Sequence, residues 1–147
     1  MARQVKSRLV QAGISHVRVF DAGTGGMDVM FQARGSRALI IIDASRSGAA
    51  PGEVFLVPGK ELELAHTPSF GLHDFRWEHA LYAGRQIFKD QFPEDVRVFL
   101  IEAADLDFGL ELSEAVRVAG DSVVERIIKD LSSTQSNQSE ISPDVQT

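Results

Sequence analysis

Hydrophobic and polar residues recur along the chain with the two periods that distinguish helices from strands. Apolar residues at helical spacing predict four helices, at residues 2–12, 27–34, 74–91 and 112–131. Short apolar or alternating runs predict four strands, at residues 15–21, 38–43, 53–57 and 96–102. Because helices separate most of the strands, the pattern indicates an α/β fold: a three-layer α/β/α sandwich with a mostly parallel, doubly wound sheet.

Local signals define the ends of several elements. Gly13 suits the end of the first helix, and Ser113 can cap the start of the last one. Pro58 followed by glycine suits the centre of a type II turn, after which residues 62–64 can pair back on the preceding strand.

The composition of the chain changes after Leu131 to Ser, Thr, Gln and Asn, with Pro143 near the end. Such a segment buries too little apolar surface to offset the entropy lost on ordering. We therefore expect residues 132–147 to be a disordered tail and residues 1–131 to form a single α/β domain.

Composition excludes several classes of protein. With 15 Lys and Arg against 21 Asp and Glu, the 147-residue chain has a net charge of −6 and lacks the basic face that nucleic-acid binding needs. The lack of cysteine excludes disulfides and thiolate metal sites. No apolar run approaches the length of a membrane span, and no apolar stretch follows the basic N-terminal residues as in a signal peptide. We expect a soluble, cytoplasmic protein.

The candidate chemistry lies at predicted strand ends. In sheets of this class functional groups lie beyond the carboxyl ends of the strands, which directs attention to Asp21, Asp43 and the loop after Glu102. Asp43 ends an unbroken apolar run, and His73 lies in the loop before a predicted helix. One carboxylate and one imidazole from separate loops could bind a first-row metal such as nickel or zinc, although a third ligand is normally required. Two alternatives stay open: Asp43 bonds to the amides of its own loop, and His73 is a polar surface residue.

Other motifs give no support for a different chemistry. The glycine-rich residues 21–26 are not followed by the Lys-Ser/Thr pair of a phosphate-binding loop, and the nucleophile pattern G-x-S-x-G is absent. The aromatic residues Phe75, Trp77 and Phe88 are interpreted as packing residues.

A set of motifs, in order along the chain, resembles the hydrogenase maturation endopeptidases. Residues 21–27 (DAGTGGM) resemble the D-G-G-T-x-G motif of that family, and residues 40–54 resemble its apolar strand ending in Asp-Ala, followed by P-G-T-V. His73 matches the histidine of the family's S-x-H motif, with the serine displaced. Residues 98–113 match a strand and the Leu-Ser pair that opens the last helix. The resemblance covers about residues 2–131.

The resemblance implies a cytoplasmic, monomeric α/β/α endopeptidase. Family members remove a C-terminal extension from the large-subunit precursor of nickel–iron hydrogenases once nickel has been inserted. Three protease ligands are thought to recognise the nickel of the substrate: an acidic residue in an N-terminal loop, an Asp at a strand end and a His. Carried over by motif, Asp43 and His73 are the second and third metal ligands, and Asp21 is the acidic residue implicated in activity or substrate recognition.

The sequence departs from the family at its start. It lacks the G-x-G-N-x-x-x-x-D-[DE]-G-x-G segment that supplies the first ligand and begins in the helix that should follow it. On this interpretation the first, central strand of the sheet is missing, and we expect the 147-residue chain to be aggregation-prone and proteolytically inactive. Two other functions stay open: a non-catalytic α/β domain that binds a hydrogenase subunit or assembly factor, and a small-ligand binder of flavodoxin-like topology.

Overall fold

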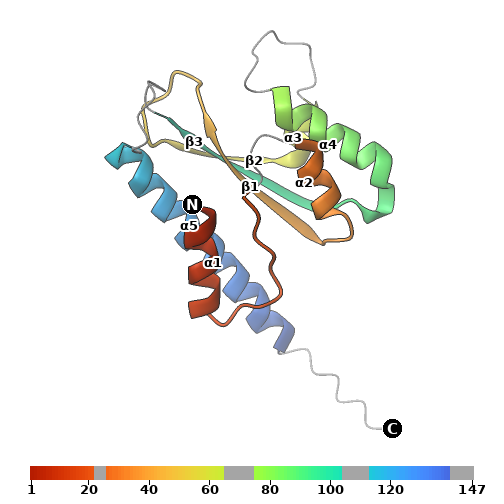
Figure 1. Ribbon diagram of the computed structural model, residues 1–147, viewed down its shortest axis with the longest axis horizontal. Helices are drawn as coiled ribbons and strands as arrows, with labels where there is room; N and C mark the ends of the chain where they lie inside the picture. The colour runs from red at the N-terminus through yellow and green to blue at the C-terminus, as the bar shows by residue number, and fades with distance from the viewer. Residues whose placement is uncertain (22–25, 65–74, 104–112, 140–147) are drawn as a thin grey trace. The chain divides into compact units, whose positions relative to one another are not determined.

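The structure is a computed structural model, which describes residues 1–21, 26–64, 75–103 and 113–139 (Figure 1). The chain divides into two compact units. The first combines Met1–Asp21 with Gly120–Thr147, and the second is Ala22–Ala119. Among the helices described, none has the length and apolar character of a transmembrane span. The prediction of a single domain over residues 1–131 stays a prediction.

The second unit is built on a three-stranded sheet with the order β1-β3-β2. The strands are β1 (Ala38–Ser45), β2 (Val54–Pro58) and β3 (Asp95–Glu102). β1 is parallel to β3, whereas β2 is antiparallel to it. The described sheet is therefore mixed rather than mostly parallel. The connection between β1 and β2 contains no helix and passes from one side of β3 to the other. Without a crossover helix to return the chain to the start of the sheet, β2 runs in the opposite direction.

Helices complete the second unit: α2 (Gly26–Ala33), α3 (Gly59–Leu64), α4 (Phe75–Phe88), the 3₁₀ turn η1 (Lys89–Gln91) and the first residues of α5 (Glu114–Ser139). One hydrophobic cluster joins α2 and α4 to a face of the sheet; it includes Met30, Ile41, Leu81, Val96 and Val98. Alternate residues of a strand share a face. The face that carries Ile41 and Val98 therefore also carries Asp43, Ser45, Leu100 and Glu102 towards the carboxyl ends of β1 and β3.

The segment after β2 corrects one prediction. Residues 59–64 form helix α3, so the expectation that residues 62–64 pair back across a turn is wrong. Pro58 ends β2, because proline has no N–H to offer a sheet. The helix then packs Leu62 against the hydrophobic cluster and places the Glu63 carboxylate 2.8 Å from the Arg85 Nε on α4.

The first unit pairs α1 (Ala2–Gln11) with the later turns of α5, as Figure 1 shows. Val5 and Leu9 of α1 are buried, and so are four apolar residues of α5: Val123, Val124, Ile127 and Ile128. An ion pair between Arg8 and Glu125 joins the two helices. α1 ends at Gln11, and the predicted stop residue Gly13 follows two residues later with a φ of +70°.

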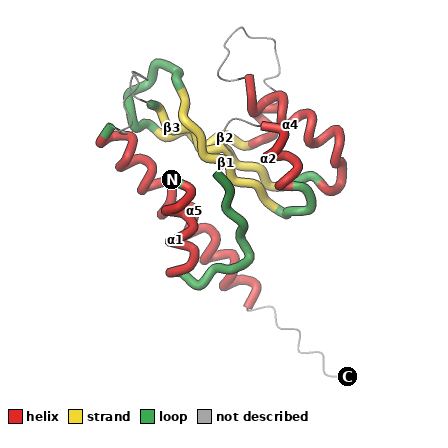
Figure 2. Tube along the Cα trace, viewed as in Figure 1, coloured by secondary structure: helices red, strands yellow, loops and turns green. Residues whose placement is uncertain are grey.

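The predicted strand at residues 15–21 is not a regular strand in the structure, and Figure 2 draws it as a loop. The alternating pattern favours an extended chain, but a strand also needs a neighbouring backbone to bond its N–H and C=O groups. Within the described ranges this segment forms no such ladder.

The last helix is longer than its pattern predicts. α5 begins under the predicted cap, since the Val116 N–H donates to the Ser113 Oγ at 3.3 Å. It continues to Ser139, eight residues beyond the predicted end at Leu131. The expectation of a disordered tail over residues 132–147 stays a prediction. A formed helix adds further residues at little cost. Within the added turns, the hydroxyls of Ser133 and Thr134 donate to the backbone carbonyls of Lys129 and Asp130.

Candidate functional site

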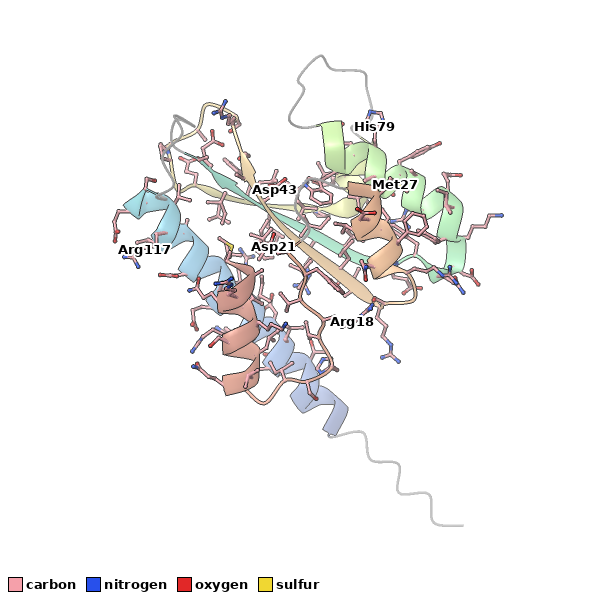
Figure 3. All side chains as sticks on the ribbon, in the orientation of Figure 1. Arg18, Asp21, Met27, Asp43, His79 and Arg117 are labelled. Carbon is pink, nitrogen blue, oxygen red and sulfur yellow. The ribbon has the colours of Figure 1, made fainter. Side chains whose placement is uncertain are left out.

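Asp43 lies on β1, two residues before the end of the strand (Figure 3). Its side chain is half-buried. The Oδ2 atom accepts a hydrogen bond from the indole Nε1–H of Trp77 at 2.7 Å, and Oδ1 accepts one from the backbone N–H of Ala44 at 2.9 Å. The apolar run thus places this carboxylate near the carboxyl edge of the sheet, where a helix fixes its orientation.

Trp77 is a site residue that the sequence does not reveal, because its aromatic ring predicts only a packing role. It does pack against the hydrophobic cluster, but its N–H also anchors the first turn of α4 to the candidate metal ligand. The sequence does contain one indication that Trp77 has a polar contact. A partly buried indole N–H usually finds a hydrogen-bond acceptor, and Trp77 is the only tryptophan, four residues beyond His73.

Glu102 is the second carboxylate on this face of the sheet, and its side chain is buried at 2% exposure. Four donors reach it: the hydroxyls of Ser45 and Ser47 and the backbone N–H groups of Ser47 and Gly48. The Ser45 hydroxyl does most to hold the pKa of the Glu102 carboxyl below its ordinary value of 4.5. The other three donors act in the same direction, whereas burial opposes them. The carboxyl is thus held in its ionised form.

The loop between β1 and β2 ends against helix α5. The Gly52 N–H donates to the Glu102 carbonyl at 2.8 Å. Gly52 has a φ of +89°, and a Cβ at this position would lie 2.7 Å from the carbonyl oxygen of Ala115. Glycine is therefore required here by both the backbone conformation and the close approach of α5.

Of the other two predicted site residues, one belongs to the first unit and one lies outside the described residues. Asp21 is exposed and belongs to the first unit. His73 lies outside the described residues, as do residues 104–112 of the loop after Glu102. Among the residues that the structure describes, no group of three or more His, Asp or Glu side chains is arranged to hold a metal ion. The roles of Asp21, Asp43 and His73 stay predictions.

Comparison with models of known protein families assigns the chain to a family. A family model described as hydrogenase maturation protease matches residues 1–130. A search of curated proteins found no match.

Solved structures share the fold. The hydrogenase maturating endopeptidase HybD from E. coli matches with a TM-score of 0.68 and 23% identity, over 91% of this chain and 86% of that one. The [NiFe] hydrogenase maturation protease HybD from Thermococcus kodakarensis matches with a TM-score of 0.60 and 22% identity, over 86% and 85% of the two chains. Both likenesses confirm the predicted α/β class.

Proposed function

The chain belongs to the hydrogenase maturation protease family, and on that premise we propose that it recognises the nickel-loaded precursor of a nickel–iron hydrogenase large subunit. It then removes the C-terminal extension of that precursor, as a monomer in the cytoplasm. In this proposal Asp43 and His73 contact the nickel of the substrate, and Asp21 acts in recognition or cleavage of the precursor.

The observation that carries the proposal is the hydrogen bond between Trp77 and Asp43. It fixes the start of α4 against the carboxyl end of β1. His73 precedes Trp77 by four residues, and four residues of chain span at most about 14 Å. In this proposal His73 therefore needs only a short length of chain to approach the Asp43 carboxylate that Trp77 contacts.

The donor set fits a borderline metal such as nickel. Carboxylate oxygen and imidazole nitrogen are both ordinary ligands of first-row metals. Metal-binding carboxylates are generally oriented by a hydrogen bond from a second residue, and Trp77 donates such a bond to Asp43 Oδ2. Bound nickel would act as the mark of a mature substrate, while the Trp77 N–H holds the carboxylate in place to receive it.

The experiment compares binding of the chain to nickel-loaded and nickel-free large-subunit precursor, with the released C-terminal peptide followed by mass spectrometry. We expect the wild-type chain to bind the nickel-loaded form more tightly by roughly tenfold or more. Asp43→Asn and His73→Ala should both remove this preference. In Asp43→Asn the amide oxygen can still accept the Trp77 N–H, so its thermal melt should stay nearly unchanged.

Matched controls are Asp90→Asn and His16→Ala, which change the same residue types at exposed positions. Both should keep the nickel preference. Equal binding to both precursors by the wild-type chain would contradict the proposal and favour a non-catalytic domain that binds the subunit itself. Nickel-dependent binding with release of the C-terminal peptide is the expected result, whereas nickel-dependent binding without cleavage would contradict the proposed cleavage step.

A further inference from the structure

Glu102 occupies the carboxyl end of β3 and divides its acceptor oxygens between two kinds of donor. Oε1 accepts the backbone N–H groups of Ser47 at 2.8 Å and Gly48 at 3.1 Å. Oε2 accepts the hydroxyls of Ser45 at 2.8 Å and Ser47 at 3.0 Å. The Glu102 side chain therefore holds the last residue of β1 and the first residues of the loop that follows it.

The backbone of Glu102 holds the other end of the same loop. Its carbonyl accepts the Gly52 N–H at 2.8 Å, and its own N–H donates to the Glu53 carbonyl at 2.8 Å. The whole connection from β1 to β2 is thus tied to one residue of β3. Asp43 lies two residues before Ser45, on the same face of the same strand.

The contacts argue against a direct chemical role for Glu102. A carboxylate has about four lone-pair sites, and four protein donors already engage this one. With its side chain at 2% exposure, it offers neither a free lone pair to a metal nor a path for a reacting proton. Its contacts are those of a group that holds a loop.

We propose that Glu102 is a positioning residue, which fixes the loop of residues 45–52 in one conformation beside Asp43 and so shapes the surface that receives the precursor. The effect of Glu102 on precursor binding rests on the proposed function, whereas its role in fixing the loop conformation does not.

Three substitutions separate positioning from chemistry. Glu102→Gln keeps the length of the side chain: its carbonyl can accept both backbone N–H groups, and its amide can donate to the two hydroxyls once these rotate. Glu102→Asp keeps the charge but is about 1.5 Å shorter, which is too short to reach Ser47 and Gly48. Glu102→Ala removes every side-chain contact. Glu94→Ala, at an exposed position just before β3, is the matched control.

The first readout is amide hydrogen exchange of Ser47 and Gly48, which needs no substrate. Exchange should be near wild type in the Gln and Glu94 variants and roughly tenfold or more faster in the Asp and Ala variants. The second readout is binding of the nickel-loaded precursor, with about tenfold weaker binding in the same two variants.

The results for the Glu102 variants can each support or overturn its proposed positioning role. A folded Glu102→Gln protein that loses precursor binding while Glu102→Asp keeps it would overturn the inference, because the charge rather than the length would then matter. Unchanged exchange in Glu102→Ala would also overturn it. If exchange follows the prediction but the wild-type chain shows no nickel preference, the loop-holding role stands and the proposed function fails.

Discussion

The hydrogen bond between Trp77 and Asp43 can be measured as a coupling free energy. The perturbation is a double-mutant cycle of Trp77→Phe and Asp43→Ala. Hydrogen bonds to charged groups contribute about 1.5–3 kcal/mol to folding stability. At 2.7 Å the Nε1–Oδ2 bond is short, but both side chains are only partly buried. We therefore expect a coupling energy near the lower end, about 1.5 kcal/mol.

The assay is urea unfolding followed by far-ultraviolet circular dichroism, because removal of the only tryptophan eliminates its fluorescence. The control cycle combines Asp43→Ala with Ile87→Ala. Ile87 is 57% exposed and lies ten residues from Trp77 on α4, about 15 Å along the helix. This control pair should be additive. A Trp77–Asp43 coupling below about 0.5 kcal/mol, the usual scatter for independent sites, would refute the idea that the bond anchors α4.

Three further predictions concern the second unit. Leu81→Ala, at a position with 1% exposure, should cost about 3 kcal/mol of unfolding free energy in urea titrations. Gly52→Ala should lower the melting temperature more than Gly48→Ala. Both glycines have positive φ, but only a Cβ at Gly52 meets the Ala115 carbonyl, so equal effects would disprove the close contact. The lowered pKa of Glu102 gives the ionised carboxyl a stabilising role above about pH 4.5, which is lost as pH falls through the folded-state pKa. Wild-type melting temperature should therefore fall more steeply than that of Glu102→Gln below this pH, and parallel curves would contradict it.

The helices and buried strands could be predicted because each is a local pattern. The unbroken apolar run before Asp43 predicts a buried strand, and the helical spacing of apolar residues within 112–131 predicts a helix. Both elements form as expected. The segment at residues 15–21 shows the limit of such reasoning. Its pattern favours extension, whereas strand formation depends on a partner elsewhere in the chain.

The candidate site could be predicted only in part. Asp43 was accessible from sequence because strand ends in α/β sheets are a known place for functional groups. Its contact with Trp77 and the bonds of Glu102 to Ser47 were not, since they join residues 34 and 55 positions apart through the tertiary fold. Nothing in the local sequence of either residue fixes such a partner.

Fluorescence of Trp77 during titration with Ni²⁺ tests the central claim most directly, because the indole touches Asp43 and is the only tryptophan in the chain. If Asp43 and His73 contact the same nickel, Ni²⁺ should quench the wild-type emission saturably. His73→Ala, which leaves the Trp77–Asp43 bond in place, should then lose the quenching, while His16→Ala keeps it. Equal, saturable quenching of the wild-type and His73→Ala proteins would contradict the claim.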